Sequence, residues 1–376
     1  MLDLHQLLDV PVKIAAVEVF RFDGHYLVRT TSANGDAGVV CANSRLPYSV
    51  PIMQDLVLPY FEGQDARDLE DLVDGVYTYK SAYKLAGLAF WNPVAYVELS
   101  LLDLLGRLTH MPVGRLFGPI VRQEISVYLS SGRRDTTPEA EVAWLGERLA
   151  ETGATAVKFK IGGRMSHNAD ALPGRTERLV PLARKELPTK ALGGDLTIYV
   201  DANGSYDAEH AVEVGRMLAD YDIAFLEEPC PWQAYWETQR VTAALALPVA
   251  GGEQDSSLPI FDWMIRDRVV DIVQPDMMYN GGLIRCMRVA ERAAAAGMPV
   301  MPHSPKAGPE AATVLQFGSV VPNLGPHQEW RGAPAAPVAW ATPFLEIHEG
   351  VVSVPDGPGL GIEYDPAIWD KAERLF

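Results

Sequence analysis

Three short stretches decide the fold: TAVKFKIGG (155–163), LTIYVDANG (196–204) and IAFLEEP (223–229). Each is a largely apolar run that has at least one charged residue in its second half. Near-continuous apolar strands of this length are typical of parallel sheets, which are covered on both faces. Between them lie segments such as AEHAVEVGRMLADY (208–221), whose apolar residues recur near every 3.6 positions and predict helices. The pattern therefore predicts repeated strand–helix units.

Five further runs extend the pattern in both directions along the chain. They are EISVYLSSG (124–132), LPVAGGE (247–253), VVDIVQPD (269–276), PVMPHS (299–304) and NLGPHQEW (323–330). Eight strand–helix repeats predict an α/β fold of the closed, TIM-type (β/α)₈ barrel class rather than an open, doubly wound sheet.

The residues that flank these repeats have a different pattern. The alternating runs VKIAAVEVFRF (12–22) and HYLVRTT (25–31) predict strands. They are followed, up to residue 111, by segments whose pattern predicts helices. Strands followed by helices indicate a separate α+β domain. We expect an N-terminal α+β capping domain over residues 1–122 and the barrel over residues 123–335. A C-terminal segment rich in Pro and Gly, residues 336–376, is expected to pack back on the capping domain.

Charge and composition exclude several classes of protein. The net charge of −17 disfavours nucleic acid and anionic membranes as partners, because both require a basic surface. No run reaches the roughly 18 apolar residues of a membrane span, and the chain starts without a signal-peptide pattern. Cys41, Cys230 and Cys286 lie far apart and are expected to be buried thiols. We expect a cytoplasmic protein that acts on a small molecule.

Acidic residues stand at the ends of three neighbouring predicted strands. These are Asp201, Glu227 and Glu253. Because the carboxyl ends of barrel strands meet on one face, the three carboxylates can share one cation. Hard oxygen ligands suit Mg²⁺, with Mn²⁺ as the alternative, and disfavour Zn²⁺. Solvated loop positions or helix N-caps would explain one such acid more readily than all three.

Two lysines share a face of the second predicted strand. Lys158 and Lys160 are two residues apart and therefore point to the same side. Their mutual repulsion and a nearby cation are expected to lower the pKa of each, which makes a lysine usable as a base. A surface pair is the alternative, but the apolar flanks in AVKFKI favour a functional pair.

The last three predicted strands also end in residues that can carry chemistry. A carboxylate at Asp276 can bind the Nδ1 proton of His303 and raise the basicity of its other nitrogen. Glu329 can donate a hydrogen bond to a substrate if protonated, or accept one if ionised. The alternatives are a core histidine and a surface acid. His327 and Trp330 are interpreted as structural or pocket-wall residues.

Taken together and in this order, these residues resemble the enolase superfamily, and specifically its mandelate racemase subgroup. The resemblance covers essentially the whole chain and implies a modified barrel whose N-terminal capping domain is completed by the C-terminal segment. It implies the following roles: Asp201, Glu227 and Glu253 as metal ligands, Asp276 and His303 as a dyad, Lys160 as the base on the opposite face, Lys158 as its electrostatic partner, and Asn203 and Glu329 as carboxylate-orienting groups. It also implies a homo-oligomer.

The activity implied by the resemblance is Mg²⁺-dependent removal of the proton α to a carboxylate, giving a metal-stabilised enediolate. We favour subsequent loss of water, as in a sugar-acid dehydratase of carbohydrate-acid catabolism that forms a 2-keto-3-deoxy acid. The alternative is a racemase or epimerase of a 2-hydroxy acid or an amino-acid derivative. Loops of the capping domain are expected to cover the site, with Arg21, Arg45 and Tyr48 as hypothetical contacts to distal hydroxyls or a second carboxylate; the alternative is that they are ordinary surface residues.

Overall fold

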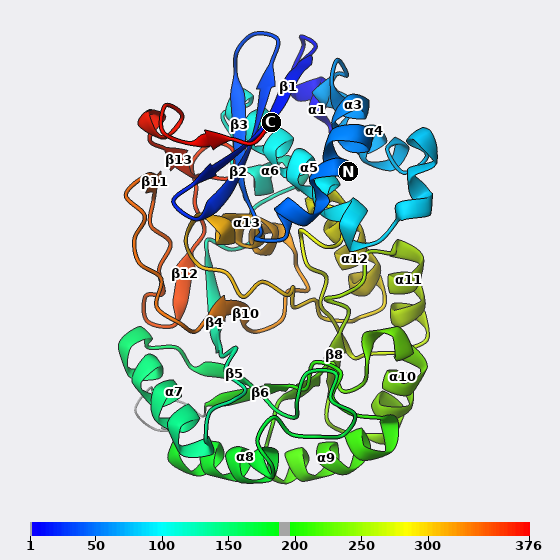
Figure 1. The fold of residues 1–376 in the computed structure, drawn as a ribbon, viewed down its shortest axis with the longest axis vertical. Helices are drawn as coiled ribbons and strands as arrows, with labels where there is room; N and C mark the ends of the chain where they lie inside the picture. The colour runs from blue at the N-terminus through cyan, green and yellow to red at the C-terminus, as the bar shows by residue number, and fades with distance from the viewer. Residues whose placement is uncertain (1, 188–195) are drawn as a thin grey trace.

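A parallel barrel lies beneath a smaller antiparallel sheet in the computed structural model, which describes residues 2–187 and 196–376 (Figure 1). The barrel sheet has the order β10-β4-β5-β6-β7-β8-β9. Its strands are β4 (Glu124–Ser130), β5 (Ala156–Lys160), β6 (Thr197–Asp201), β7 (Phe225–Glu227), β8 (Val249–Gly251), β9 (Ile272–Val273) and β10 (Gln328–Arg331). Parallel bridges from Val273 to Val300 and from Val300 to Leu324 join β9 to the segment that ends in β10. The predicted barrel class is confirmed.

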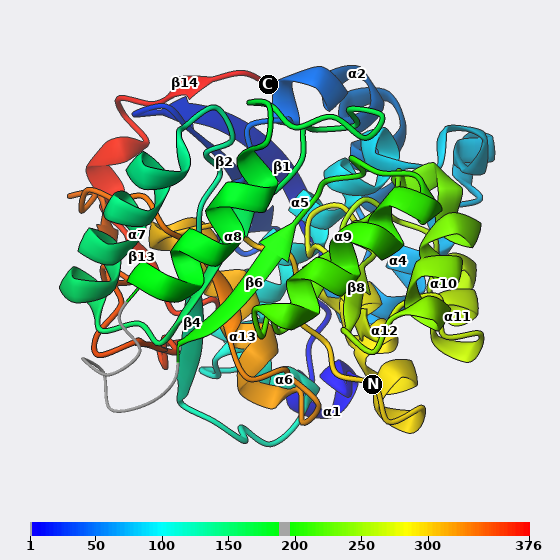
Figure 2. The ribbon, with the colours of Figure 1, turned by 90° about the horizontal axis from the view of Figure 1, so that it is seen from below.

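Helices cover the outside of the barrel. They are α7 (Pro138–Thr152), α8 (Arg175–Glu186), α9 (Ala208–Asp220), α10 (Tyr235–Ala244), α11 (Leu258–Arg266), α12 (Leu283–Ala295) and α13 (Ala312–Val320). Seen from below, α7 to α10 lie side by side across one face of the strands (Figure 2). Side-chain caps begin two of them: Thr137 accepts the N–H of Ala140, and Asp207 accepts that of His210.

The eighth repeat differs from the prediction because no helix follows it. Residues 332–376, all of which the structure describes, contain the short strands β11 (Ala341–Thr342), β12 (Val351–Ser353), β13 (Glu363–Tyr364) and β14 (Glu373–Arg374), and no α-helix. The reason is local: the sequence GAPAAPVAWATPF directly after β10 carries three prolines, which remove helix hydrogen bonds and clash with the preceding turn.

The capping domain places a four-stranded antiparallel sheet on one long helix. The sheet order is β14-β1-β2-β3, with β1 (Ile14–Phe22), β2 (His25–Ser32) and β3 (Ala37–Ala42). The domain's helices are α1 (Leu4–Leu7), α2 (Val50–Ile52), α3 (Leu58–Phe61), α4 (Leu69–Gly75), α5 (Leu88–Leu108) and α6 (Val113–Phe117). A Cβ at Gly38 of β3 would lie 2.2 Å from the Leu104 backbone nitrogen of α5. Glycine at this position therefore lets the sheet pack directly on the helix.

Helix α5 forms the core between the capping sheet and the barrel. By length and mean hydropathy alone it could cross a membrane, but 89% of its most apolar window is buried within the protein. Glu98 on α5 accepts the backbone N–H groups of Leu283 (3.1 Å) and Ile284 (2.8 Å) at the start of α12. A Cβ on Gly282, whose φ is 113°, would meet this carboxyl group at 2.5 Å. The capping domain thus caps a barrel helix directly.

The C-terminal segment contacts both layers. β14 pairs with β1, and Trp369 packs edge-on against Phe20 with ring centroids 5.1 Å apart. β12 pairs antiparallel with β4 at the start of the barrel. The segment therefore completes the capping sheet as predicted and also adds a strand beside the barrel; the proposed boundaries, 122/123 and 335/336, stay predictions.

Candidate active site

Four barrel strands carry an apolar residue of the inner layer, followed two positions later by a polar or charged one. The pairs are Ala156 and Lys158, Tyr199 and Asp201, Phe225 and Glu227, and Ile272 and Gln274. Residues two apart share a face of a strand, so the sequence places an apolar layer below a charged one. The apolar layer forms its own buried cluster, to which Tyr128 and Met301 also belong. It provides the dry floor on which the charged layer rests.

Asp201, Glu227 and Glu253 converge in this charged layer. Each offers a carboxylate oxygen within 4.8 Å of the others, and all three side chains are buried. Burial raises the pKa of Glu227 to about 8, against the opposing effect of Lys158. Burial also opposes ionisation of Asp201, yet the ammonium groups of Lys160 and Lys158 hold its pKa well below the usual range. Three buried carboxylates on adjacent strands form a donor set that fits a hard divalent cation.

Two residues that the sequence analysis missed support these acids. Gln274 is fully buried and donates its side-chain N–H to Glu227 Oε2 at 2.8 Å. Glu228 is also buried, and its carboxylate accepts from Asn203 Nδ2 at 3.3 Å. Both lie near the ends of the runs predicted as strands, which was the available signal.

Lys158 is fully buried and holds two carboxylates. Its Nζ lies 2.7 and 2.8 Å from the oxygens of Glu227 and 2.8 Å from Glu329 Oε1. Although burial opposes its charge, Glu227 and Glu329 raise the pKa of Lys158 well above the usual range. The two contacting carboxylates therefore outweigh the predicted repulsion from Lys160, while the lowering expected from a nearby cation stays a prediction.

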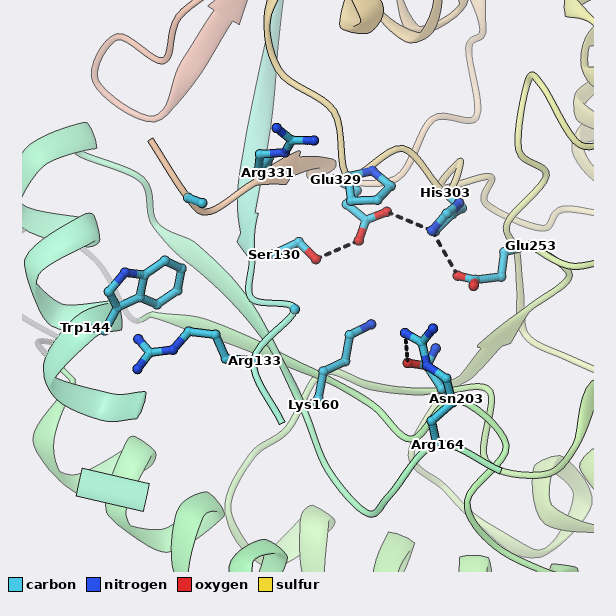
Figure 3. Close-up of a pocket in the computed structure, with 13 residues that line it drawn as sticks. Ser130, Arg133, Trp144, Lys160, Arg164, Asn203, Glu253, His303, Glu329 and Arg331 are labelled. Atoms are coloured by element: carbon cyan, nitrogen blue, oxygen red, sulfur yellow. Dashed lines mark hydrogen bonds and ion pairs between the residues drawn. The ribbon is translucent and has the colours of Figure 1, made fainter. Parts of the chain in front are cut away.

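Lys160 and His303 face each other across the cavity. Lys160 reaches in from β5, where its Nζ contacts Asp201 Oδ2, and His303 reaches in from the opposite side (Figure 3). His303 Nδ1 lies 2.8 Å from Asp276 Oδ2, and Nε2 lies 3.4 Å from Glu253 Oε2. Burial opposes the charge of His303, but Glu253, Glu329 and Asp276 together raise its pKa to about 10. An amine and an imidazole are thus presented to the same space from opposite directions.

Asn203 and Glu329 lie beside this space. Asn203 donates from Nδ2 to Asp201 Oδ2 at 3.0 Å. Glu329 accepts from Ser130 Oγ at 2.7 Å and from the backbone N–H of Ser304 at 2.8 Å. Burial opposes ionisation of Glu329, but Lys158 and His303 lower its pKa to about 2. Of the two roles left open by the sequence, the geometry favours the ionised acceptor.

The structure brings only one of the three predicted capping-domain contacts to the site. Arg45 lines a cavity of about 400 Å³ beside His303 and donates to the Tyr279 hydroxyl at 2.7 Å. Arg21 instead donates to Glu373 on β14 at 2.8 Å, and Tyr48 is 85% exposed; neither lines the described cavities next to His303. Arg21 was misplaced because the sequence does not reveal which strand flanks β1.

The main cavity has a volume of about 760 Å³ and a basic wall that sequence reasoning missed. Arg133, Arg164 and Arg331 line it together with Lys160 and His303 (Figure 3). Each arginine follows the end of a predicted strand by at most a few residues. Because loops after barrel strands build the active-site face, that position was the available signal.

Comparison with known proteins agrees with this geometry. Residues 141–368 match the protein family described as enolase C-terminal domain-like. The chain is similar to the arabinonate dehydratase of Saccharolobus solfataricus, at 26% identity over 97% of this chain and 92% of the relative. It is also similar to a solved "putative racemase" from Roseobacter denitrificans, at 34% identity, TM-score 0.88 and coverage of 96% and 99%. A mandelate racemase/muconate lactonizing protein from Paracoccus denitrificans PD1222, solved with magnesium, matches at 26% identity, TM-score 0.86 and coverage of 97% and 99%.

Proposed function

Because the chain belongs to the enolase superfamily and, within it, to the mandelate racemase subgroup, we propose that it removes the proton α to the carboxylate of a sugar acid and then eliminates water. The product would be a 2-keto-3-deoxy acid. The chain is an enzyme of the lyase or isomerase type. The observation that carries the proposal is the placement of Lys160 and His303 on opposite sides of a cavity that Glu253 lines, with Asp201 and Glu227 buried within 4.8 Å of it.

The metal ligands in this proposal are Asp201, Glu227 and Glu253, whose buried oxygens lie within 4.8 Å of one another. Bound there, Mg²⁺, or Mn²⁺ as the alternative, would hold the substrate carboxylate and stabilise the negative charge that develops as the α-proton leaves. Lys158, fixed between Glu227 and Glu329, would add a buried positive charge on the same side.

The proton transfers follow from the facing pair. Lys160 Nζ takes the α-proton, and the electron pair of that C–H bond forms the bond between Cα and Cβ. The Cβ–O bond breaks on the opposite face, where the departing hydroxyl takes a proton from His303 Nε2 and leaves as water. Asp276 holds the other ring nitrogen at 2.8 Å and so aims Nε2 into the cavity. The enol that remains becomes the 2-keto acid by tautomerisation.

Glu329 would accept a hydrogen bond from a substrate hydroxyl in this scheme, because the ionised form is already held by Lys158, Ser130 and the Ser304 N–H. Asn203, beside Asp201, would help to orient the substrate carboxylate.

A second outcome uses the same residues. If the α-carbon is reprotonated from the His303 side before a hydroxyl leaves, the product is the epimer. The 34% identical structure described as a "putative racemase" favours keeping this alternative. The two outcomes differ in whether the β-hydroxyl is lost.

A panel of aldonic and aldaric acids in D₂O with Mg²⁺ tests the proposal. We expect one acid to yield a 2-keto acid detected by a carbonyl reagent, and EDTA to abolish turnover until Mg²⁺ is restored. Exchange of the α-proton without any keto acid would replace dehydration by epimerisation. The absence of both keto acid and exchange with every acid of the panel, or full turnover in EDTA, would contradict the proposal. The variant Arg178→Met, changed on the outer surface of α8, should give the same products as the wild-type protein and serves as the control for later site variants.

A further inference from the structure

The side-chain amide of Asn203 lies between two groups of opposite chemistry. On one side are acids: Nδ2 lies 3.0 Å from Asp201 Oδ2 and 3.3 Å from Glu228 Oε2. On the other side are arginines: Oδ1 lies 2.6 Å from Arg134 Nη2 and 3.4 Å from Arg164 Nη2. Asn203 also lines both cavities of the candidate site (Figure 3). The direction in which this amide points therefore decides what a ligand meets there.

Only one orientation of the amide satisfies both sides. The pKa of Asp201 is held well below the usual range, so its carboxylate is ionised and only accepts hydrogen bonds. The guanidinium group of Arg134 only donates them. Turning the amide over would set Oδ1 against the carboxylate and the NH₂ group against the guanidinium, and both hydrogen bonds would be lost. Asn203 is therefore held by an acceptor on one side and a donor on the other.

Arg134 is itself fixed in place from behind. It lies in the loop between β4 and α7, and its Nη1 donates to the backbone oxygens of Ile161 (2.6 Å) and Gly162 (3.2 Å), directly after β5. Within the part of the chain that the structure describes, Asn203 is the one side chain that Arg134 contacts by a hydrogen bond or ion pair. Because the guanidinium group is planar, two anchored contacts fix the direction of the third. Arg134 thus ties the ends of three neighbouring strands together.

Resting on the proposed function, we propose that Arg134 is a positioning residue that holds the N–H groups of Asn203 toward the metal ligand Asp201 and the carboxylate of the substrate. In the reverse orientation, the amide oxygen would face these negative charges and repel them. Arg134 lines neither of the two cavities that Asn203 lines, so it acts through the amide and not by touching the substrate.

Arg164 is the competing candidate for this role, because it also approaches the amide oxygen of Asn203. Its contact is longer, at 3.4 Å against 2.6 Å for Arg134. Its side chain makes no second hydrogen bond among the described residues, whereas Arg134 is anchored on two backbone oxygens. Arg164 lines both cavities and is free to contact a ligand instead (Figure 3). The shorter and anchored contact favours Arg134.

Hydrogen exchange of the Asn203 side-chain amide tests the inference without metal or substrate. In protein labelled with ¹⁵N at asparagine, Asn203→Ala identifies the signal by its loss. We expect Arg134→Met to speed exchange of the Nδ2 protons at least about tenfold, as for loss of a hydrogen bond to a charged group. Arg134→Lys, which keeps a charged donor, should give a smaller increase, and Arg178→Met should give none. Backbone amides of β4, β5 and β6 should keep their protection, because a general loosening of the fold would speed them as well.

Calorimetric titration of Mg²⁺ shows whether Arg134 acts through the amide. Arg134→Met should raise the Kd for Mg²⁺ by about tenfold. The double variant with Asn203→Ala should bind Mg²⁺ no more weakly than Asn203→Ala alone, because the two residues form one unit.

Three outcomes overturn the inference: unchanged amide exchange in Arg134→Met, faster exchange in Arg164→Met but not in Arg134→Met, or additive effects of the two substitutions on the Kd. Because amide exchange requires neither metal nor turnover, faster exchange in Arg134→Met, in a protein that converts no acid of the panel, would contradict only the proposed function.

Discussion

Two sheets of this protein carry charged pairs between different strands, but the surroundings of the pairs differ. In the barrel, Lys158 on β5 contacts Glu227 on β7, and both side chains have 0% exposure. In the capping sheet, Arg21 on β1 contacts Glu373 on β14, with 54% and 55% exposure. Water and salt screen the second pair, whereas removing one member of the first leaves a buried charge uncompensated. Location in the fold, rather than the kind of pair, therefore decides how much a residue matters.

Substitution of Lys160 or His303 should give the largest loss of activity. It would therefore test most sharply the contrast between the buried barrel residues and the exposed pair of the capping sheet. We expect Lys160→Ala and His303→Asn each to lower kcat/KM by about 10² to 10⁴, because each removes a positioned acid or base. Steady-state assays on the best acid of the panel measure this. The thermal midpoint in Mg²⁺ checks that the fold is intact. Retention of more than a tenth of the activity by either variant contradicts its assigned role.

Substitution of Gln274, which contacts the proposed metal ligand Glu227, should have an intermediate effect on activity. Gln274→Leu removes the hydrogen bond to Glu227 while keeping side-chain bulk, and we expect Mg²⁺ affinity to fall by about 10- to 100-fold. Calorimetric titration of Mg²⁺ measures this directly. Excess Mg²⁺ should recover much of the activity; a purely structural defect would instead lower the thermal midpoint without changing the Kd for Mg²⁺.

Substitution of Asp65, a partly buried acid of the capping domain, should lower the unfolding free energy without changing activity. Asp65 pairs with Arg67 at 2.8 Å and accepts the backbone N–H groups of Val12 and Arg67. Although burial opposes its ionisation, these contacts lower the pKa of Asp65 from 3.8 to about 2. Asp65→Ala should cost about 1 to 2 kcal/mol of unfolding free energy at pH 7.

The pH dependence of that cost gives a sign that can be checked. Between pH 4 and pH 2 the unfolded chain binds more protons at Asp65 than the folded one, so the contribution is complete above about pH 4 and is lost as the pH falls toward 2. Urea titrations of wild type and variant should converge over this range. A difference that grows on acidification would contradict the assigned ion pair.

The exposed pair should show the smallest effect. Arg21→Met is expected to change the unfolding free energy by less than about 0.5 kcal/mol and to leave the kinetics unchanged, because solvent screens its contact with Glu373. If it instead raised KM substantially, Arg21 would belong to the site after all and the contrast between the two sheets would fail.

The charged residues at the barrel mouth were predicted well from the sequence, because strand geometry is regular. Residues two apart share a face and parallel strands end at one edge, so the spacing along the chain is enough to place Lys158, Lys160 and Asp201 at the barrel mouth. The two carboxylate partners of Lys158 were not predicted, since they come from β7 and β10, and contacts between strands far apart in sequence follow no local pattern.

The rim of the cavity was predicted poorly for the same reason. Arg133, Arg164 and Arg331 lie in or next to loops after strands, where no repeat fixes the direction of a side chain. Arg21 and Tyr48 looked equally suitable in sequence, but the pairing of β14 with β1 places Arg21 against Glu373, and Tyr48 is exposed. Long-range packing, which composition and spacing do not encode simply, decides the rim.

The contact of Glu98 with the start of α12 bears on how reactants travel. Swinging the capping domain away as a rigid lid would leave this buried carboxylate and two backbone N–H groups without partners, in the same helix that follows β9 and Asp276. We therefore expect reactants to enter and leave between the loops at the mouth of the barrel, among them the one that carries Arg45, while the two layers stay joined.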